Sequence, residues 1–137
     1  MNALGFSDRL DDLIGSLSKG NKQKVAIIAA LLHDPTVLLL DEPIIGLDPI
    51  SAKIFKEYLL ELKLQGKAIL FSTHILEIAE KMCDRVAVIY RGKIIAEGTI
   101  EELKSEARVR GTLEDVFLQV TRKSEEVSKI IEALREI

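Results

Sequence analysis

A short apolar run that ends in two carboxylates is the clearest local pattern along the chain. Residues 37–40 (VLLL) are apolar without interruption, and Asp41 and Glu42 follow at once. A continuous rather than alternating apolar run predicts a strand that is buried on both faces of a parallel sheet. Because open α/β sheets bind ligands beyond the carboxyl ends of their strands, the pattern places both acids at a ligand-binding edge.

Apolar residues at helical spacing predict helices before and after this strand. A short helix is expected to begin at Ser7 and to end at Gly15. The next is expected over residues 21–33, with a broad apolar face that would make it largely buried. Another is expected to begin at Pro49 and to end at Gly66. The apolar positions of these last two helices are Val25, Ile27, Ile28, Leu31 and Leu32, and Ile54, Phe55, Tyr58, Leu59 and Leu62.

A second apolar run predicts another strand of the same sheet. Residues 68–71 form this short strand, which ends at residues 72–74 (STH), and a helix is expected over residues 75–82. Residues 85–90 and 93–96 predict two strands joined by a two-residue turn, which is a hairpin signal. Strands that alternate with helices in this way require right-handed crossovers and a parallel sheet, which the hairpin is expected to close at one side.

The C-terminal third predicts helices only. Residues 99–102 (TIEE) and 112–115 (TLED) each have the pattern of a capping box, and an apolar stripe at helical spacing begins at Ser124. A weak boundary between these helices predicts two domains: residues 1–104 with the sheet, and residues 105–137 as a helical extension.

Composition narrows the class of protein. The chain has 137 residues, 47% of them hydrophobic, which is enough to bury a core. With 22 acids and 19 bases its formal charge is −3, so a nucleic-acid partner is disfavoured. The single cysteine, Cys83, cannot form an internal disulfide. No apolar stretch approaches the ~20 residues that cross a bilayer, so no membrane span is expected.

Adjacent carboxylates at a strand end suit phosphate ester chemistry. One can hold Mg²⁺, usually through water, while its neighbour orients and polarises an attacking water molecule. Taken alone, however, such a pair can equally be solvated acids near a helix N-terminus. An isolated histidine after a strand is likewise more often structural, and Ser18 and Asp48 could each be simple helix caps.

Four motifs in a fixed order favour the catalytic interpretation of these residues over the structural one. They are LSKGN at residues 17–21, LLLDEP at 38–43, GLDP at 46–49 and STH at 72–74. As a set they resemble the ATP-binding cassette ATPase family, and the resemblance extends over about residues 17–103. It implies the C-terminal part of a P-loop NTPase-type α/β fold, with a parallel sheet, flanking helices, a closing β-hairpin and a small helical C-terminal extension.

The resemblance assigns roles to four acidic and histidine positions. Asp41 matches the Walker B aspartate, which supports Mg²⁺, and Glu42 matches the catalytic carboxylate that activates water. Asp48 matches the D-loop aspartate, which couples two nucleotide sites across a dimer. His74 matches the switch histidine, which contacts the γ-phosphate.

The segment before the first long helix resembles the family signature, usually written LSGGQ. Here it supplies Ser18, Lys19, Gly20 and Asn21, so Lys19 and Asn21 depart from the pattern but remain hydrogen-bond donors. A hydroxyl, a glycine and free N–H groups at a helix N-terminus together form a phosphate clamp. In the family this clamp closes on the nucleotide that the opposing subunit holds.

One hallmark of the family is missing from these 137 residues. The Walker A loop, GxxxxGK followed by Ser or Thr, does not occur, and Gly66 with Lys67 has neither the earlier glycine nor the hydroxyl. The upstream aromatic residue and glutamine loop are absent as well. We therefore expect a fragment that retains the catalytic edge and the signature but is inactive alone.

The expected function is that of the ATP-binding and ATP-hydrolysing subunit of an exporter-type transporter. ATP and Mg²⁺ would be its ligands, bound weakly or not at all by the fragment. Its partners would be a second cassette subunit and a transmembrane subunit, at the cytoplasmic face of the membrane, and exposed strand edges favour homo-oligomers. The alternative is a non-catalytic module for dimerisation or partner binding. A cassette ATPase of DNA repair or translation shares the motifs but is disfavoured by the acidic balance.

Overall fold

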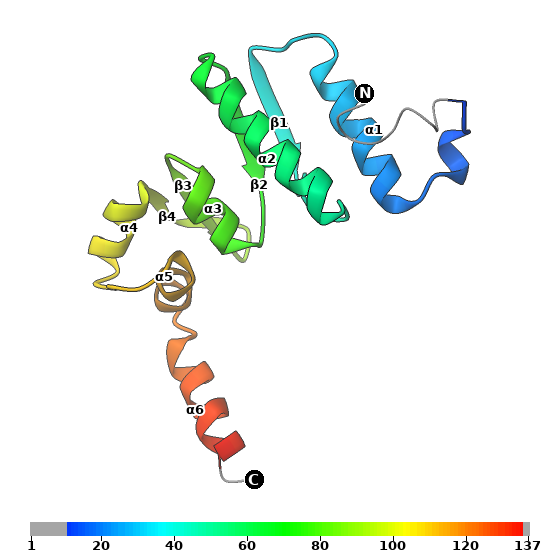
Figure 1. Cartoon of the computed structure of the whole chain (residues 1–137). Coiled ribbons are helices and arrows are strands. Elements are labelled where there is room, and N and C mark those ends of the chain that lie inside the picture. The colour runs from blue at the N-terminus through cyan, green and yellow to red at the C-terminus, as the bar shows by residue number, and fades with distance from the viewer. Residues whose placement is uncertain (1–10, 136–137) are drawn as a thin grey trace. The chain divides into compact units, whose positions relative to one another are not determined.

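The computed structural model describes residues 11–135, except for the side chains of residues 124–128. The chain forms two compact units that divide after His74, and each is described by itself (Figure 1). The domain boundary expected at residue 105 stays a prediction. The start of the helix expected from Ser7 lies outside the described residues.

The first unit contains a parallel pair of strands and two long helices. Strand β1 pairs with β2 in parallel, and Asp41 lies opposite Ser72 in their register. This confirms the α/β class and the parallel pairing that the sequence predicts. The elements are η3 (Ile14–Ser16), α1 (Lys19–Leu31), β1 (Val37–Asp41), α2 (Pro49–Leu64) and β2 (Ala68–Ser72).

Side-chain caps determine where the helices of this unit begin. The Ser18 hydroxyl accepts a hydrogen bond from the Asn21 N–H at 3.3 Å, so α1 begins at Lys19, two residues before the expected start. Asp48 caps α2 in the same way, and Pro49 occupies the first turn, where it lacks only a donor that would be unpaired in any case. Gly66, with φ of +85°, follows the end of α2.

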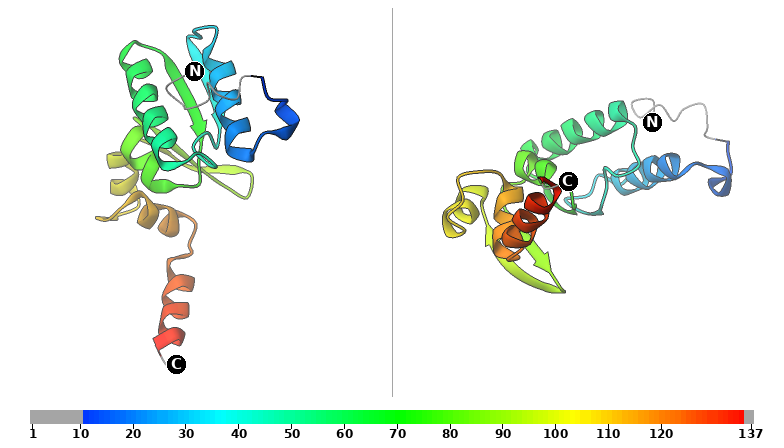
Figure 2. Two further views of the ribbon diagram at one scale, coloured as in Figure 1. Left: turned by 45° about the vertical axis from the view of Figure 1, so that its right-hand side comes forward. Right: turned by 90° about the horizontal axis from the view of Figure 1, so that it is seen from below.

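Among the described residues, only one face of the β1–β2 sheet is covered. Helix α2 lies beside the sheet (Figures 1 and 2), and its Phe55, Leu59 and Leu62 are buried, as is Leu38 of β1, which is 2% exposed. Val37, Leu39 and Leu70 are 57%, 73% and 69% exposed. The prediction that β1 is buried on both faces is therefore wrong, because its alternate side chains point away from α2. We call Val37, Leu39 and Leu70 the open sheet face.

Helix α1 is also less buried than expected. Of its apolar residues only Ile27 is buried, and Leu32, just past its end, is 67% exposed. Its N-terminal half instead packs against the turn after β1. A methyl group on Gly20 would lie only 2.5 Å from the Gly46 carbonyl oxygen, so the two backbones are in direct contact.

The second unit consists of a hairpin and four helices. Its elements are α3 (Leu76–Met82), β3 (Val86–Tyr90), β4 (Lys93–Gly98), α4 (Ile100–Glu106), α5 (Leu113–Val120) and α6 (Ser124–Arg135). Arg91 and Gly92 both have positive φ, of 50° and 76°, as a two-residue hairpin turn requires. The hairpin is seen in yellow-green in Figure 2.

The hairpin is present as the sequence predicts. Strands β3 and β4 pair with each other in an antiparallel sheet of two strands, and β1 and β2 form the other sheet of the described residues. The expectation that the hairpin closes the parallel sheet stays a prediction. Hairpin pairing is set by the local turn, whereas a pairing between β3 and a distant strand has no signal in the local pattern.

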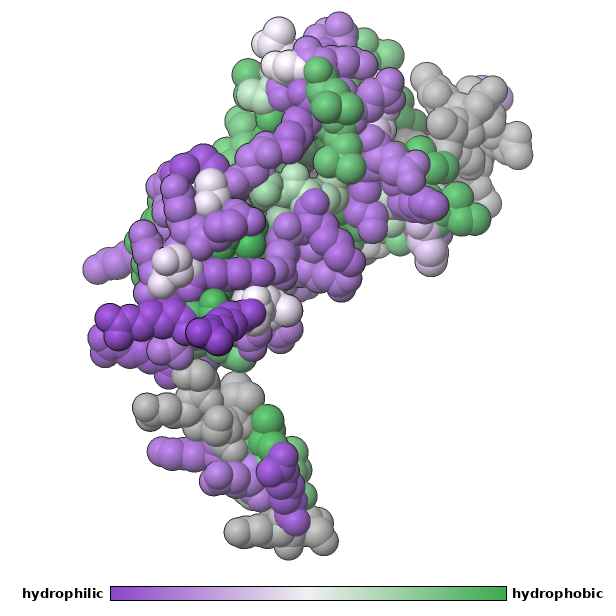
Figure 3. Space-filling model, turned by 60° about the vertical axis from the view of Figure 1, so that its left-hand side comes forward, coloured by the Kyte–Doolittle hydropathy of each residue, from purple (hydrophilic) through white to green (hydrophobic). Residues whose placement is uncertain are grey.

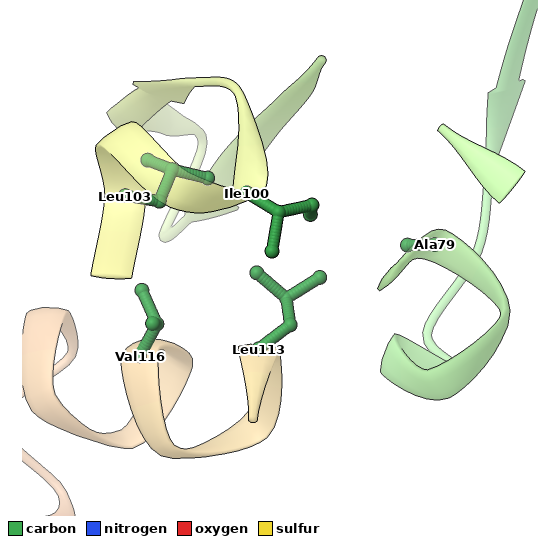
Figure 4. Close-up of a cluster of buried hydrophobic side chains, with 5 residues drawn as sticks. All are labelled: Ala79, Ile100, Leu103, Leu113 and Val116. Carbon is green, nitrogen blue, oxygen red and sulfur yellow. The ribbon is translucent and has the colours of Figure 1, made fainter. Parts of the chain in front are cut away.

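A cluster of aliphatic side chains forms the core of the second unit. It contains Ala79 of α3, Ile100 and Leu103 of α4, and Leu113 and Val116 of α5 (Figure 4). Both expected capping boxes are present, at Thr99 and Thr112, and they set the starts of α4 and α5.

A glutamate ties three helices of this unit together. Glu80 of α3 accepts hydrogen bonds from Lys104 Nζ at 2.6 Å and from the Leu113 N–H at 3.1 Å. These two donors hold the pKa of Glu80 below its usual value.

Helix α6 has apolar residues that the core of the second unit does not bury. Its Ile130, Ile131 and Leu134 are exposed, and apolar atoms are visible there in Figure 3. In the described part of the chain, no helix is both long enough and apolar enough to cross a membrane.

We expect Gly20→Ala to destabilise the first unit. The added methyl group meets a backbone carbonyl that cannot rotate away. Overpacking of about 1–3 kcal/mol outweighs the ~1 kcal/mol that alanine gains in a helix, so the free energy of unfolding should fall by about 1 kcal/mol. Gly15→Ala is the matched control, since its methyl group would meet nothing within 4 Å. Equal urea denaturation midpoints for the two variants would contradict the close contact.

Leu113→Ala should destabilise the second unit. Leu113 is 0% exposed, so truncation leaves a cavity and should cost about 2–5 kcal/mol. Leu134→Ala, at a position 64% exposed, should change stability by less than about 0.5 kcal/mol. Urea unfolding followed by circular dichroism measures both values, and similar costs would show that the α3–α4–α5 cluster is not the core.

Candidate functional site

The carboxyl ends of β1 and β2 bring the predicted acids and the histidine together. Asp41 is the last residue of β1, and Ser72, opposite it, is the last residue of β2. The Ser72 hydroxyl donates a hydrogen bond to Asp41 Oδ1. Glu42 and His74 follow these two residues, and we call the four residues the acid–histidine edge. The parallel pairing thus places Asp41, Glu42 and His74 at one edge of the sheet, the edge at which the sequence predicts the two acids.

The backbone of Glu42 adopts an uncommon conformation. Its φ is +43°, in the left-handed region that costs a residue other than glycine about 1–3 kcal/mol. The Glu42 N–H donates to the Ser72 carbonyl at 3.2 Å and contacts Ser72 Oγ at 3.0 Å. These bonds hold the strained residue against β2, and such strain is concentrated at functional sites.

The two oxygens of the Glu42 carboxylate have different environments. Oε1 accepts from the His74 N–H at 3.1 Å and lies 2.7 Å from His74 Nδ1. Oε2 is buried and has no hydrogen-bond partner among the described residues. An unpaired buried carboxylate oxygen is costly, so this atom is the natural acceptor for a water molecule or substrate group.

The contact with Glu42 also orients the imidazole of His74. An ionised Glu42 favours the proton on Nδ1, which leaves Nε2 as an acceptor, or as a second donor when the ring is protonated. The His74 side chain is 72% exposed, so Nε2 is open to a ligand. The pair can therefore hold a water molecule through Glu42 and, when both ring nitrogens carry a proton, donate a hydrogen bond to an anion through His74 Nε2.

The clamp segment, residues 18–21, lies at the N-terminus of α1. Ser18 is the helix cap, and its hydroxyl and the first N–H groups of α1 are at the surface. Within the described residues no hydrogen bond joins the segment to Asp41, Glu42 or His74. The segment thus begins α1, with Ser18 as its cap, and its role as a phosphate clamp stays a prediction.

Both carboxylate oxygens of Asp48 accept hydrogen bonds from residues of its own unit. Its Oδ1 accepts from the Ser51 N–H at 2.9 Å, and its Oδ2 accepts from Ser51 Oγ at 2.7 Å and from Lys24 Nζ at 2.8 Å. The Lys24 ammonium, and then Ser51, hold the pKa of Asp48 well below its usual range. The helix-cap alternative is therefore correct, and the D-loop role stays a prediction beside it.

Three residues of the site were not singled out by sequence reasoning. Ser72 bridges the two strand ends, while Gln23 Nε2 donates to the Pro43 carbonyl at 3.1 Å and Lys24 pairs with Asp48. The sequence contained a signal for Ser72 as a site residue, because this serine is the first residue of the STH motif. Gln23 and Lys24 lie three and four residues after Gly20, on the helix face that contacts the turn.

The donor set of the edge fits Mg²⁺ only as part of a larger site. Among the described residues, no three His, Cys, Asp or Glu side chains cluster in a way that could hold a metal ion alone. Mg²⁺ usually takes one or two carboxylates and completes its shell with water and substrate phosphate. Exposed Asp41 beside Ser72 Oγ, and the unpaired Glu42 Oε2, meet that requirement.

Comparisons with known proteins give an AAA-type domain model and relatives that are transporter ATP-binding proteins. A family model described as "AAA domain, putative AbiEii toxin, Type IV TA system" matches residues 9–80. The ABC transporter ATP-binding protein NatA of Bacillus subtilis is 45% identical over 104 residues, which are 76% of this chain and 42% of that protein. A fluoroquinolones export ATP-binding protein of Mycobacterium tuberculosis is 40% identical over 111 residues, 79% of this chain and 37% of the relative.

Solved structures give the same result. The ATP-binding subunit of an ABC transporter matches with a TM-score of 0.83 and 36% identity, over 88% of this chain and 50% of that one. A dimeric ATP-binding cassette bound to ADP and phosphate matches with a TM-score of 0.64 and 25% identity, over 72% of this chain and 43% of that one. The chain thus spans half or less of each relative. The motifs, the fold and these relatives together show that the chain belongs to the family of ABC transporter ATP-binding proteins.

Proposed function

We propose that this chain is part of the ATP-binding and ATP-hydrolysing subunit of an exporter-type ABC transporter. The observation that carries the proposal is the state of Glu42. Its backbone is strained, one carboxylate oxygen pairs with His74, and the other is buried without a partner. A carboxylate held in this way is suited to accept a proton from an attacking water molecule.

Each residue of the edge then has a distinct task. Asp41 would hold Mg²⁺, which when bound neutralises charge on the β- and γ-phosphates. Glu42 Oε2 would accept a hydrogen bond from the water molecule and align it for attack. His74, with both ring nitrogens protonated, would donate from Nε2 to a γ-phosphate oxygen, while its Nδ1–H remains against Glu42 Oε1 and keeps the imidazole oriented.

The clamp segment would act on a second subunit. Ser18, Lys19, Gly20 and Asn21 present a hydroxyl, a cation, an amide and free helix N–H groups, which together attract phosphate. As the family resemblance implies, they would close on the nucleotide of an opposing cassette, and Asp48 would lie near that junction. A transmembrane subunit at the cytoplasmic face of the membrane would receive the resulting motion.

The 137 residues contain no GxxxxGK[ST] loop, so their contribution to ATP binding is incomplete. Catalysis of phosphoryl transfer depends on positioning and electrostatics. Without the main phosphate cradle, the remaining edge cannot hold the γ-phosphate in line with the water molecule.

The purified 137-residue chain should therefore show no ATPase activity above background. A version extended upstream through a Walker A loop should hydrolyse MgATP, and Glu42→Gln should lower its kcat by at least about a hundredfold, because the water acceptor is lost. Glu57→Gln, at an exposed position on α2, is the matched control and should leave kcat unchanged. A steady-state phosphate-release assay measures all four proteins. Robust hydrolysis by the 137-residue chain, or an active Glu42→Gln variant, would refute the proposal.

The open sheet face favours a second candidate function, a non-catalytic dimerisation module. Val37, Leu39 and Leu70 are exposed on adjacent strands, and Leu39 and Leu70 are direct partners in the register. Apolar side chains grouped in this way are typical of an interaction surface. In this function a second copy of the chain would cover the face without nucleotide.

Light scattering over a range of protein concentrations tests this candidate. The chain should form dimers without ATP, and Leu39→Glu should raise the dimer dissociation constant by about tenfold or more, since a charge would be desolvated. Leu64→Glu, at a position 87% exposed on α2, should leave it unchanged. A monomer at all concentrations, or equal effects of the two variants, would rule out dimerisation through this face.

A further inference from the structure

Three residues of helix α1 contact the turn after β1. Gly20 lies against the Gly46 carbonyl, and Gln23 Nε2 donates to the Pro43 carbonyl at 3.1 Å. The third contact is the ion pair between Lys24 Nζ and Asp48 Oδ2, at 2.8 Å. None of these contacts involves the side chains of Asp41, Glu42 or His74. They join the helix that bears the clamp segment to the backbone that leaves the acid–histidine edge.

Of these contacts, the Lys24–Asp48 pair is the one between two charged side chains. The Lys24 side chain is only 12% exposed, whereas that of Asp48 is 48% exposed. A largely buried ammonium group without its carboxylate would be poorly solvated, so the pair opposes movement of α1 away from the turn. The two Ser51 hydrogen bonds hold the carboxylate in place from the side of α2.

The position of Lys24 on α1 allows its ion pair with Asp48 to fix the position of the clamp segment. Lys24 lies six residues after Ser18, or about 9 Å along a helix of 1.5 Å rise per residue. Because a helix of this length moves as a rigid rod, fixing Lys24 also fixes the N–H groups at its N-terminus. At the other end of the turn, the Pro43 carbonyl that Gln23 contacts belongs to the residue next to Glu42.

We propose that Lys24 is a positioning residue, whose ion pair with Asp48 sets the clamp segment relative to the acid–histidine edge and transmits changes at Asp48 to the clamp. This inference rests on the proposed function, in which the edge serves one nucleotide and the clamp serves the nucleotide of a second subunit. Lys24 would then join the two sites within one chain. The Asp48 side chain is 48% exposed, so part of it is accessible to an approaching subunit while its Oδ2 stays paired with Lys24.

A double-mutant cycle on the 137-residue chain tests the transmission directly. Asp48→Asn should shift the amide NMR signals of residues 18–21, since removal of the charge releases Lys24. In a Lys24→Met background the same substitution should shift them by at least about threefold less, because the connection is already broken. Lys24→Arg, which keeps the charge, should restore most of the response. Lys53→Met, at an exposed lysine of α2, is the control and should leave the response intact.

A residue that only stabilised the fold would give a different result. It would lower the melting temperature without changing how the clamp responds to Asp48. Equal shifts from Asp48→Asn in the wild-type and Lys24→Met backgrounds would overturn the proposal, whatever the stability of the variants.

Kinetics of the version extended through a Walker A loop separate this proposal from the proposed function. Lys24→Met should lower kcat about tenfold while the KM for MgATP changes less than about twofold, because the clamp is misplaced but the cradle is intact. Lys24→Arg should recover most of the rate, and Lys53→Met should match the wild type. An inactive wild-type protein would refute the proposed function and leave the NMR cycle to decide the role of Lys24. An active protein in which Lys24→Met changes nothing would refute the positioning role.

Discussion

The parallel register of β1 and β2 is the constraint on which the candidate site depends. It places Asp41 opposite Ser72, so that Ser72 can bond to the Asp41 carboxylate and to the Glu42 N–H at once. Those bonds hold Glu42 in its left-handed conformation, which brings its carboxylate to His74. A slip of one residue would turn every side chain of one strand to the other face and separate the acids from the histidine.

Two carboxylates of the first unit illustrate how local environment assigns different tasks. Asp48 has donors on both oxygens and a lowered pKa, so it remains ionised and acts as a structural anion between α1 and α2. Glu42 has donors on one oxygen only, and the other is buried and unpaired. A saturated carboxylate stabilises the fold, whereas a half-satisfied one stores the free energy that a bound water molecule or ligand would recover.

Local signals in the sequence were sufficient for much of the fold and the edge. Thr99 and Thr112 predicted helix starts, and the end of the apolar run at β1 predicted that Asp41 and Glu42 lie at the sheet edge. Properties that depend on distant parts of the chain were not predictable in this way. The apolar run at β1 shows that its side chains suit burial, but not whether anything covers Val37 and Leu39. Likewise, a lysine or a glutamine on a helix face gives no indication of which acid or carbonyl it will meet.

The α3–α4–α5 cluster of the second unit and the β1–β2 sheet of the first differ in how completely residues of their own unit bury and pair their side chains. In the second, residues of α3, α4 and α5 bury one another, and Glu80 finds both of its donors within the unit. In the first, the open sheet face and the unpaired Glu42 Oε2 both lack a partner among the described residues. An exposed apolar face costs about 25 cal/mol for each Å² left in water, and an unpaired buried oxygen adds to that cost. Both functions proposed for the chain therefore require additional contacts to the first unit, which is also the unit that contains the acid–histidine edge and the clamp segment.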